Sequence, residues 1–214
     1  MHTQVFGLDS PPMISRERIL EAAARVYAKH GFRGATTRLI AIEAGVNEVT
    51  LFRTFGSKSA LIEAVLGLHH EKAPPPELPA EPADVEAELT VFVQTSLDRV
   101  REMRPLLVHS MGESDERPEA AAFACRGRTH VHDTITSYLR RLQERGMASV
   151  DIDVDAVSVI FTGTVMSDAI ARSFVPEVYP PLEEAAGRYV SCFLRMIGAT
   201  KAAKPTGPTR SRVA

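Results

Sequence analysis

The chain has 214 residues, of which 44% are hydrophobic, enough to bury a core in one larger domain or two small ones. Charged residues make up 24% and the formal net charge is −2, which excludes a uniformly basic molecule. Residues 13–60 nevertheless hold eight basic and four acidic side chains, a local charge of +4 that leaves −6 for the rest. A basic head on an acidic body is typical of a domain that meets phosphate.

The cysteines and the apolar segments bear on the cellular compartment. Cys125 and Cys192 lie far apart and lack C-x-x-C spacing, so no disulfide framework is expected and a cytoplasmic location is predicted. The first twelve residues have neither the basic nor the apolar region of a signal peptide. The most apolar stretch, residues 156–171, is short and contains Asp168, so no membrane contact is expected.

Helical periodicity runs through most of the chain and strand signals are scarce, so an all-α fold is predicted. Residues 1–13 are expected to be a loose arm. Residues 14–30 form the first predicted helix, with Ser15 as its N-cap. Gly31 is expected to end this helix in the left-handed conformation, and Phe32 to pack back on it.

Three shorter helices follow, each preceded by a polar cap. Side chains of Thr, Asn and Ser accept hydrogen bonds from the free amides of a first helical turn, and glycine takes the positive φ of a turn. The predicted helices are 37–44 capped by Thr36, 48–55 capped by Asn47 after a turn at Gly45, and 58–71 capped by Ser57 after Gly56. The first three helices form a predicted head within residues 13–60, and the fourth connects it to the body.

A proline-rich segment, residues 73–82, follows the fourth helix. Proline lacks the amide donor and clashes with the preceding turn, so this segment is predicted to be a linker. A helical body is predicted over residues 83–198, and a disordered basic tail over residues 199–214. The expected body helices are 84–104 ended by Pro105, 106–111, 118–145, 154–174 ended by Pro176, and 182–197.

Two short helices joined by a glycine-containing turn are the signature of a helix-turn-helix motif, here residues 36–55. Ala41 is small where the two helices must touch, and Gly45 stands where the turn needs positive φ. Apolar residues are expected where the three helices of the head meet, at Ile40, Val46, Leu51 and Phe55. The other side of the last helix, predicted to reach the major groove of DNA, carries Thr50, Arg53 and Thr54.

Several pieces of this region occur in a recognisable order. They are Gly31-Phe32, Thr36-Thr37, Ile40-Ala41, Ala44-Gly45-Val46, Thr50-Leu51-Phe52-Arg53, Phe55 and Ser57-Lys58. Together, residues 15–66 resemble the DNA-binding domain of the tetracycline-repressor (TetR) family. The resemblance implies a three-helix DNA-binding head, a larger C-terminal helical bundle for ligand binding and dimerisation, and a dimeric transcriptional regulator.

The resemblance also assigns contacts with DNA. Thr37, Arg38 and Lys58 are expected to meet phosphates at helix starts, and Arg53 to lie at the groove, where it can read guanine. The sequence departs from the family at Phe52, usually tyrosine, at Val49, often glycine, and at Glu48, which can accept from cytosine or merely cap the helix. The predicted DNA-binding residues are Thr37, Arg38, Glu48, Thr50, Phe52, Arg53, Thr54 and Lys58.

A homodimer and a small-molecule effector are further implications of the resemblance. Members of the family dimerise through their last two long helices, which suits a palindromic operator with half-sites about one helical turn apart. The expected interface residues are Val159, Gly163, Ile170, Tyr189, Cys192, Phe193 and Met196. The expected lining of a largely hydrophobic effector pocket is Phe92, Ser96, Met103, His109, Met111, Phe123, Tyr138, Phe161, Met166 and Phe174. A ligand-released repressor is the main hypothesis, and activation stays open.

Metal binding, catalysis and a scaffold role are the alternatives to this hypothesis. The histidine pairs lack a third ligand at i+4, and the run of Asp151, Asp153 and Asp155 departs from the EF-hand pattern, so no metal or other cofactor is expected. An enzyme is the main alternative from another class, but the common nucleophile-elbow and phosphate-loop motifs are absent from the sequence. A helical scaffold or sensor with weakened DNA binding is the third hypothesis, because Phe52 and Glu48 depart from the family pattern.

Overall fold

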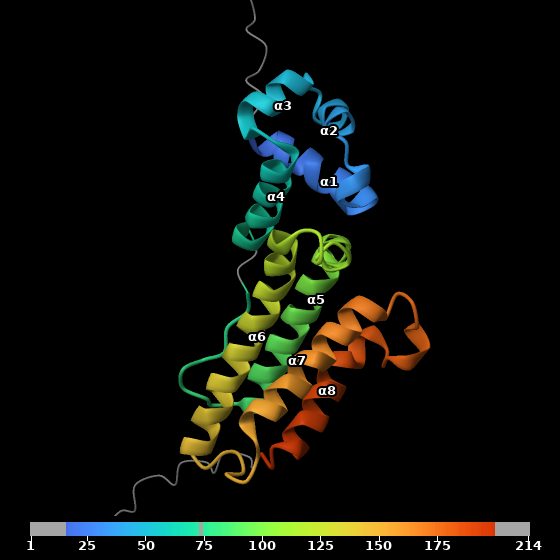
Figure 1. Ribbon diagram of the computed structural model, residues 1–214. Coiled ribbons are helices and arrows are strands. Elements are labelled where there is room, and N and C mark those ends of the chain that lie inside the picture. Colours follow the sequence, from blue (N-terminus) through green and yellow to red (C-terminus); the bar gives the residue numbers. More distant parts are fainter. Residues whose placement is uncertain (1–15, 73–74, 200–214) are drawn as a thin grey trace, which may run out of the picture. The chain divides into compact units, whose positions relative to one another are not determined.

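The computed structural model describes residues 16–72 and 75–199 (Figure 1). Within these ranges the regular structure consists of α-helices and one short 3-10 helix, with no strand. The predicted all-α fold class is therefore confirmed. The predicted N-terminal arm, the Ser15 cap and the basic tail beyond residue 199 lie outside the described residues.

The helices of the described chain agree closely with the predicted order. They are α1 (Arg16–Gly34), α2 (Thr37–Ala44), α3 (Glu48–Phe55), α4 (Lys58–Lys72), α5 (Val85–Gly112), α6 (Pro118–Glu144), α7 (Val154–Ala171), η1 (Pro176–Val178) and α8 (Leu182–Met196). No helix occupies residues 75–84, as predicted for a proline-rich linker. Asp153, from the acidic run before α7, caps this helix, its side chain accepting a hydrogen bond from the amide of Ala156.

The described residues divide into two compact units. The first unit contains the chain up to Lys72 together with Pro105–Phe123, and the second contains Ala73–Arg104 and the chain from Ala124 onward. Helices α5 and α6 therefore each contribute to both units. This division differs from the expected boundary at the proline-rich segment, because the end of α5 and the start of α6 group with α1–α4.

The predicted helix stop at Pro105 is wrong. Helix α5 continues through this proline to Gly112, so the expected separate helix 106–111 is the last part of α5. A proline inside a helix removes one hydrogen bond and costs about 3 kcal/mol. The turn that follows buries Leu106, Leu107 and Ser110, and this burial offsets the loss.

Helix α1 has a kink where an end was predicted. Gly31 adopts φ 63° and ψ −177°, which is outside the helical region, as expected for glycine. A further helical turn follows, because the amide of Ala35 donates to the carbonyl of Gly31 at 3.0 Å. The glycine therefore bends the helix, and α1 ends only at Gly34.

The second unit is a bundle of α5, α6, α7 and α8 around one apolar core. In Figure 1, α7 and α8 lie side by side in this unit. Aromatic rings join the helices: Phe92 lies 6.2 Å from Phe161, and Phe161 packs edge-on against Phe193 at 4.5 Å between ring centres. Such pairs add to the free energy of folding beyond the area they bury.

Helix α7 is long and apolar enough, by length and composition alone, to cross a membrane. Its inner side belongs to the core just described, through residues such as Val157, Phe161 and Val165. Its Asp168 is fully buried and pairs with Arg101 of α5 and Arg172. These contacts are those of a core helix in a folded bundle.

Candidate nucleic-acid interface

Local hydrogen bonds set the angle between α2 and α3. The hydroxyl of Thr36 accepts from the amide of Leu39 at 3.2 Å, and the amide oxygen of Asn47 accepts from Val49 at 2.8 Å. Between them, Gly45 takes φ 64° and ψ 39°, the left-handed conformation that lets the chain reverse. The predicted caps and turn of the helix-turn-helix motif are confirmed.

The inner face of the motif is apolar and closed to solvent. Ile40, Ala41 and Leu51 are buried, so α2 and α3 are fixed against the rest of the first unit. Phe55 is only partly buried, and its ring lies 5.1 Å below the guanidinium of Arg16. Because one side of each helix is committed to this core, the opposite side is the one available to a partner.

The predicted DNA-binding residues divide by exposure. Arg38, Phe52, Arg53 and Thr54 are exposed, whereas Thr37, Glu48, Thr50 and Lys58 are partly buried. Val49 is 70% exposed and Phe52 is 47% exposed, so the outer face of α3 carries two apolar side chains next to its arginine. Val49 is not among the predicted DNA-binding residues, but its exposure makes it part of this face.

Glu48 makes a contact that the sequence did not indicate. The hydroxyl of Thr37 donates to its carboxylate at 3.1 Å, which joins the first turns of α2 and α3. Asn47 caps α3, so the alternative in which Glu48 caps this helix is wrong. A carboxylate in the first turn still interacts favourably with the positive end of the helix.

Lys58, expected at a phosphate, is directed toward an aromatic ring. Its ammonium lies 4.3 Å from the centre of the Phe32 ring, and the Arg117 guanidinium lies 3.6 Å from the same centre. Burial, followed by the charge of Arg117, lowers the pKa of Lys58. Ser57 accepts from the amide of Ala60 at 3.1 Å and so caps the start of α4, as predicted.

Glu113, at the turn between α5 and α6, holds the kink of α1. Its carboxylate accepts from the amide of Phe32 at 2.6 Å, from the hydroxyl of Tyr27 at 3.0 Å and from Arg117 at 3.0 Å. Burial, partly opposed by a hydrogen bond with Ser110, raises the pKa of Tyr27 to about 12. Sequence reasoning missed this cluster because Glu113 is more than 80 residues away from Tyr27 and Phe32 in the chain.

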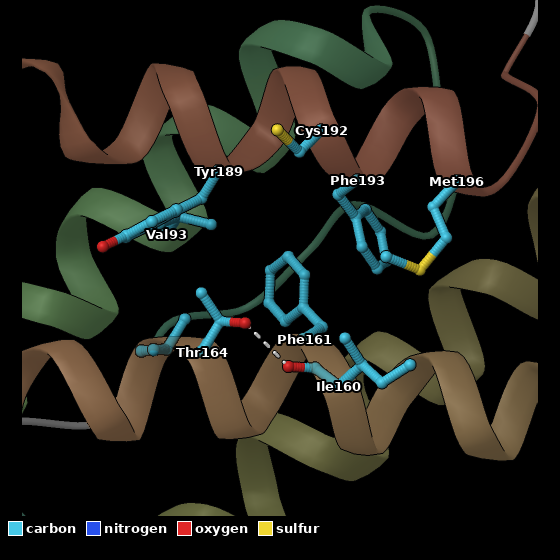
Figure 2. Close-up of a pocket in the computed structure, with 9 residues that line it drawn as sticks. Val93, Ile160, Phe161, Thr164, Tyr189, Cys192, Phe193 and Met196 are labelled. Carbon is cyan, nitrogen blue, oxygen red and sulfur yellow. Dashed lines mark hydrogen bonds between the residues drawn. The ribbon is translucent and has the colours of Figure 1, made fainter. Parts of the chain in front are cut away.

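The two sets of residues predicted in the body overlap at one cavity of about 180 Å³ between α7 and α8. Figure 2 shows the ring of Phe161, from α7, pointing toward Phe193 of α8, with Tyr189 farther along α8. Phe161 was predicted in the effector pocket, and four residues predicted at the dimer interface line the same cavity: Tyr189, Cys192, Phe193 and Met196.

The other predicted pocket residues are distributed over both units. Phe92, Ser96 and Tyr138 are buried in the second unit, where Met103 and Met166 are half-buried and Phe174 is exposed below Arg104. His109, Met111 and Phe123 belong to the first unit. Of the remaining predicted interface residues, Val159 is exposed, and Gly163 and Ile170 are half-buried.

No group of three or more potential metal-ligating side chains occurs among the described residues. Cys125 and Cys192 are free thiols, both exposed.

Comparison with known proteins agrees with this geometry. The family model "Bacterial regulatory proteins, tetR family" matches residues 19–65, which contain α2, α3 and their turn. The uncharacterized HTH-type transcriptional regulator YvkB of Bacillus subtilis is 46% identical over 55 residues, 26% of this chain and 29% of that protein. The HTH-type transcriptional regulator UidR of Escherichia coli is 27% identical over 169 residues, 76% of this chain and 85% of that protein.

The likeness in fold extends over most of the chain. A crystal structure of a transcriptional regulator from Rhodococcus sp. superimposes with a TM-score of 0.68 at 22% identity, covering 89% of this chain and 100% of that one. Residues 19–65 therefore form a DNA-binding domain of the TetR type, and the chain is similar to helix-turn-helix transcriptional regulators over most of its length.

Proposed function

We propose that this regulator binds a palindromic operator as a homodimer in the cytoplasm and represses transcription until a small, largely hydrophobic ligand releases it. One observation carries the DNA-binding part of the proposal. Arg38, Arg53 and Thr54 are exposed on the side of α2 and α3 that faces away from the buried inner face. This arrangement presents cations and a hydroxyl to a groove while the core fixes the helix angle.

Each side chain of the outer face suits a different contact. Arg53 can donate two hydrogen bonds to guanine in the major groove, which discriminates between bases. Val49 and Phe52 can pack on thymine methyl groups. Arg38 can pair with a phosphate and set the register without reading sequence. Phe52, which lacks the hydroxyl of the tyrosine usual in the family, would thus contribute apolar contact instead.

The proposed dimer uses α7 and α8. Val159, Ile160 and Met196 are between 44% and 52% exposed, so both helices carry large apolar side chains at the surface. Burying such side chains against a second copy gains hydrophobic free energy. A two-fold dimer would present two α3 helices to the two half-sites of a palindrome.

The proposed effector site lies in the second unit. Its core contains aromatic side chains from four helices, and the cavity beside Phe161 and Phe193 is lined mostly by apolar and aromatic side chains. An apolar ligand would gain free energy there by leaving water. Such a ligand releases DNA only if it binds the non-binding arrangement of the dimer more tightly.

The test begins with selection of bound sequences from random duplex DNA by the purified protein at about physiological salt. We expect a palindromic sequence bound at least ~10³-fold more tightly than random DNA. Arg53→Ala should then weaken operator binding about 5-fold to 150-fold. Arg126→Ala, which removes an exposed arginine of α6, is the matched control and should leave affinity unchanged.

Two results would contradict the proposal. An unchanged operator affinity of Arg53→Ala would remove Arg53 from the interface. Failure to enrich any sequence would favour a helical protein in which Glu48 and Phe52 have weakened specific binding. A reporter gene placed behind the selected operator then separates repression from activation.

A further inference from the structure

The second unit contains an arginine whose charge is not neutralised by any hydrogen bond among the described residues. Both terminal nitrogens of Arg99, on α5, are inaccessible to solvent and lack a hydrogen-bond partner there. The neighbouring Arg101 differs, because it bonds to the buried Asp168 at 3.0 Å. Glu102, an acidic group that favours the charge of Arg99, is itself exposed.

An unpaired guanidinium inside a protein is costly. Arginine keeps its charge in proteins, so it cannot avoid the cost by losing a proton as lysine can. Burial lowers the pKa of Arg99, which reflects the same loss of solvation. Proteins normally pair such a charge, and the group that matches the planar fork of a guanidinium best is a carboxylate or phosphate.

Arg99 lies on the side of α5 that carries three residues predicted to line the effector pocket. Phe92, Ser96, Arg99 and Met103 follow one another at helical spacing and so share one side of α5. Three of them were predicted pocket residues, and Phe92 packs against Phe161 in the core. Arg99 therefore adds a positive charge to a side of α5 whose other three residues here are apolar or neutral.

Two buried hydroxyls in the same unit also lack partners. Thr136 of α6 and Thr162 of α7 are buried, and neither hydroxyl has a hydrogen-bond partner among the described residues. Other hydroxyls of this unit do have partners, because each donates a hydrogen bond to the carbonyl four residues earlier in its helix: Ser96 to Phe92, Ser158 to Val154, and Thr164 to Ile160. Polar groups that are costly to leave unpaired thus occur on three helices of one core.

We propose that Arg99 binds the carboxylate of the effector, and that the effector is an organic acid with an apolar body. The proposal rests on the proposed function, in which the second unit binds a ligand. The apolar stripe would hold the body of the acid, and the guanidinium would make a bidentate pair with its carboxylate. Neutral apolar compounds of the same shape would leave Arg99 unpaired and would bind more weakly.

The experiment compares acids with their primary amides on the full-length protein. The panel is benzoate, cinnamate, octanoate and laurate, each measured beside its amide by the shift in melting temperature. We expect at least one acid to raise the melting temperature by about 2 °C or more, with a smaller shift for its amide. Arg99→Met should abolish this difference, whereas Arg128→Met, at an exposed arginine of α6, should keep it.

Arg99→Lys is a second variant that keeps the proposal testable if Arg99→Met does not fold. It keeps the positive charge without the planar fork, so it should retain a weaker preference for acids. The proposal is wrong if no acid of the panel exceeds its amide on the wild-type protein, or if Arg99→Met keeps the difference. Operator binding is measured separately, and Arg99→Met should bind like the wild-type protein. If the wild-type protein binds no operator sequence, the proposed function is wrong, whatever the comparison of acids and amides shows.

Discussion

Asp168 should be the most destabilising single position to neutralise in the second unit. Its carboxylate is fully buried and accepts hydrogen bonds from Arg172 at 2.8 and 2.5 Å, from Arg101 at 3.0 Å and from Tyr189 at 2.6 Å. The side chains of Arg101 and Arg172 are only 19% and 17% exposed. Asp168→Asn would leave Arg172 without its counter-charge, and Arg101 with the exposed Asp98, 3.5 Å away, as its remaining ion-pair partner.

The magnitude follows from the burial of these groups. Breaking a buried ion pair by removing one partner costs about 3–5 kcal/mol. For a protein of this size, 1 kcal/mol corresponds to about 2–4 °C in melting temperature. We therefore expect Asp168→Asn to lower the melting temperature by about 6–20 °C at neutral pH, measured by circular dichroism or calorimetry.

Asp155 provides a matched control on the same helix. It pairs with Arg140 at 3.2 Å, but the two side chains are 73% and 61% exposed. Exposed pairs contribute about 0–1 kcal/mol, so Asp155→Asn should lower the melting temperature by no more than about 4 °C. Equal effects of the two substitutions would refute the argument that burial makes the Asp168 pairs strong.

The pH dependence gives a second measurement of the same group. Burial alone would raise the pKa of Asp168, but hydrogen bonds from Arg172, Tyr189 and Arg101 outweigh it and lower the pKa below 3.8. A lowered pKa in the folded state means that the stabilisation is complete above pH 3.8 and is lost as the pH falls further. Asp168→Asn should therefore lose less stability than the wild-type protein on acidification below that value.

Three further predictions concern the first unit. Gly31→Ala should destabilise it by about 1–3 kcal/mol in a melting assay, because φ is positive and the new Cβ would lie 2.9 Å from Nδ1 of His109. The control Gly67→Ala adds a Cβ that meets no atom within 4 Å, so in the same assay it should stabilise the unit by about 0.5–1 kcal/mol. Asn47→Ala should cost about 1 kcal/mol by removing the cap of α3, seen as a lower melting temperature. The raised pKa of Tyr27, about 12, means that its stabilisation is complete below pH 10 and is lost between pH 10 and 12; Tyr27→Phe should flatten this alkaline loss.

The local features of the fold could be predicted from the sequence. Thr36, Gly45, Asn47 and Ser57 each act on residues no more than four positions away along the chain, so the residue type and its position suffice. The buried side of α2 and α3 follows from helical spacing for the same reason. The outward side of α3 then follows by exclusion, with Arg53 on it.

Features that depend on distant residues could not be predicted. Proline normally ends a helix, and only the burial of Leu106 and Leu107 explains why α5 passes through Pro105. The contact of Lys58 with Phe32 and the pairing of Thr37 with Glu48 likewise depend on how helices meet. Spacing along one helix also cannot separate a residue that lines a ligand cavity from one at a subunit interface, which is why the two predicted sets met at Phe161 and Tyr189.

The cluster around Glu113 has a consequence for engineering. Chimeric regulators are designed by joining the DNA-binding segment of one protein to the sensing segment of another, and the proline-rich segment after α4 is an obvious place to recombine them. Here that junction would separate the kink of α1 from its acceptor, because the amide of Phe32 and the hydroxyl of Tyr27 both depend on Glu113. A transplanted segment should therefore include residues 105–123 of its own parent as well as the first 72.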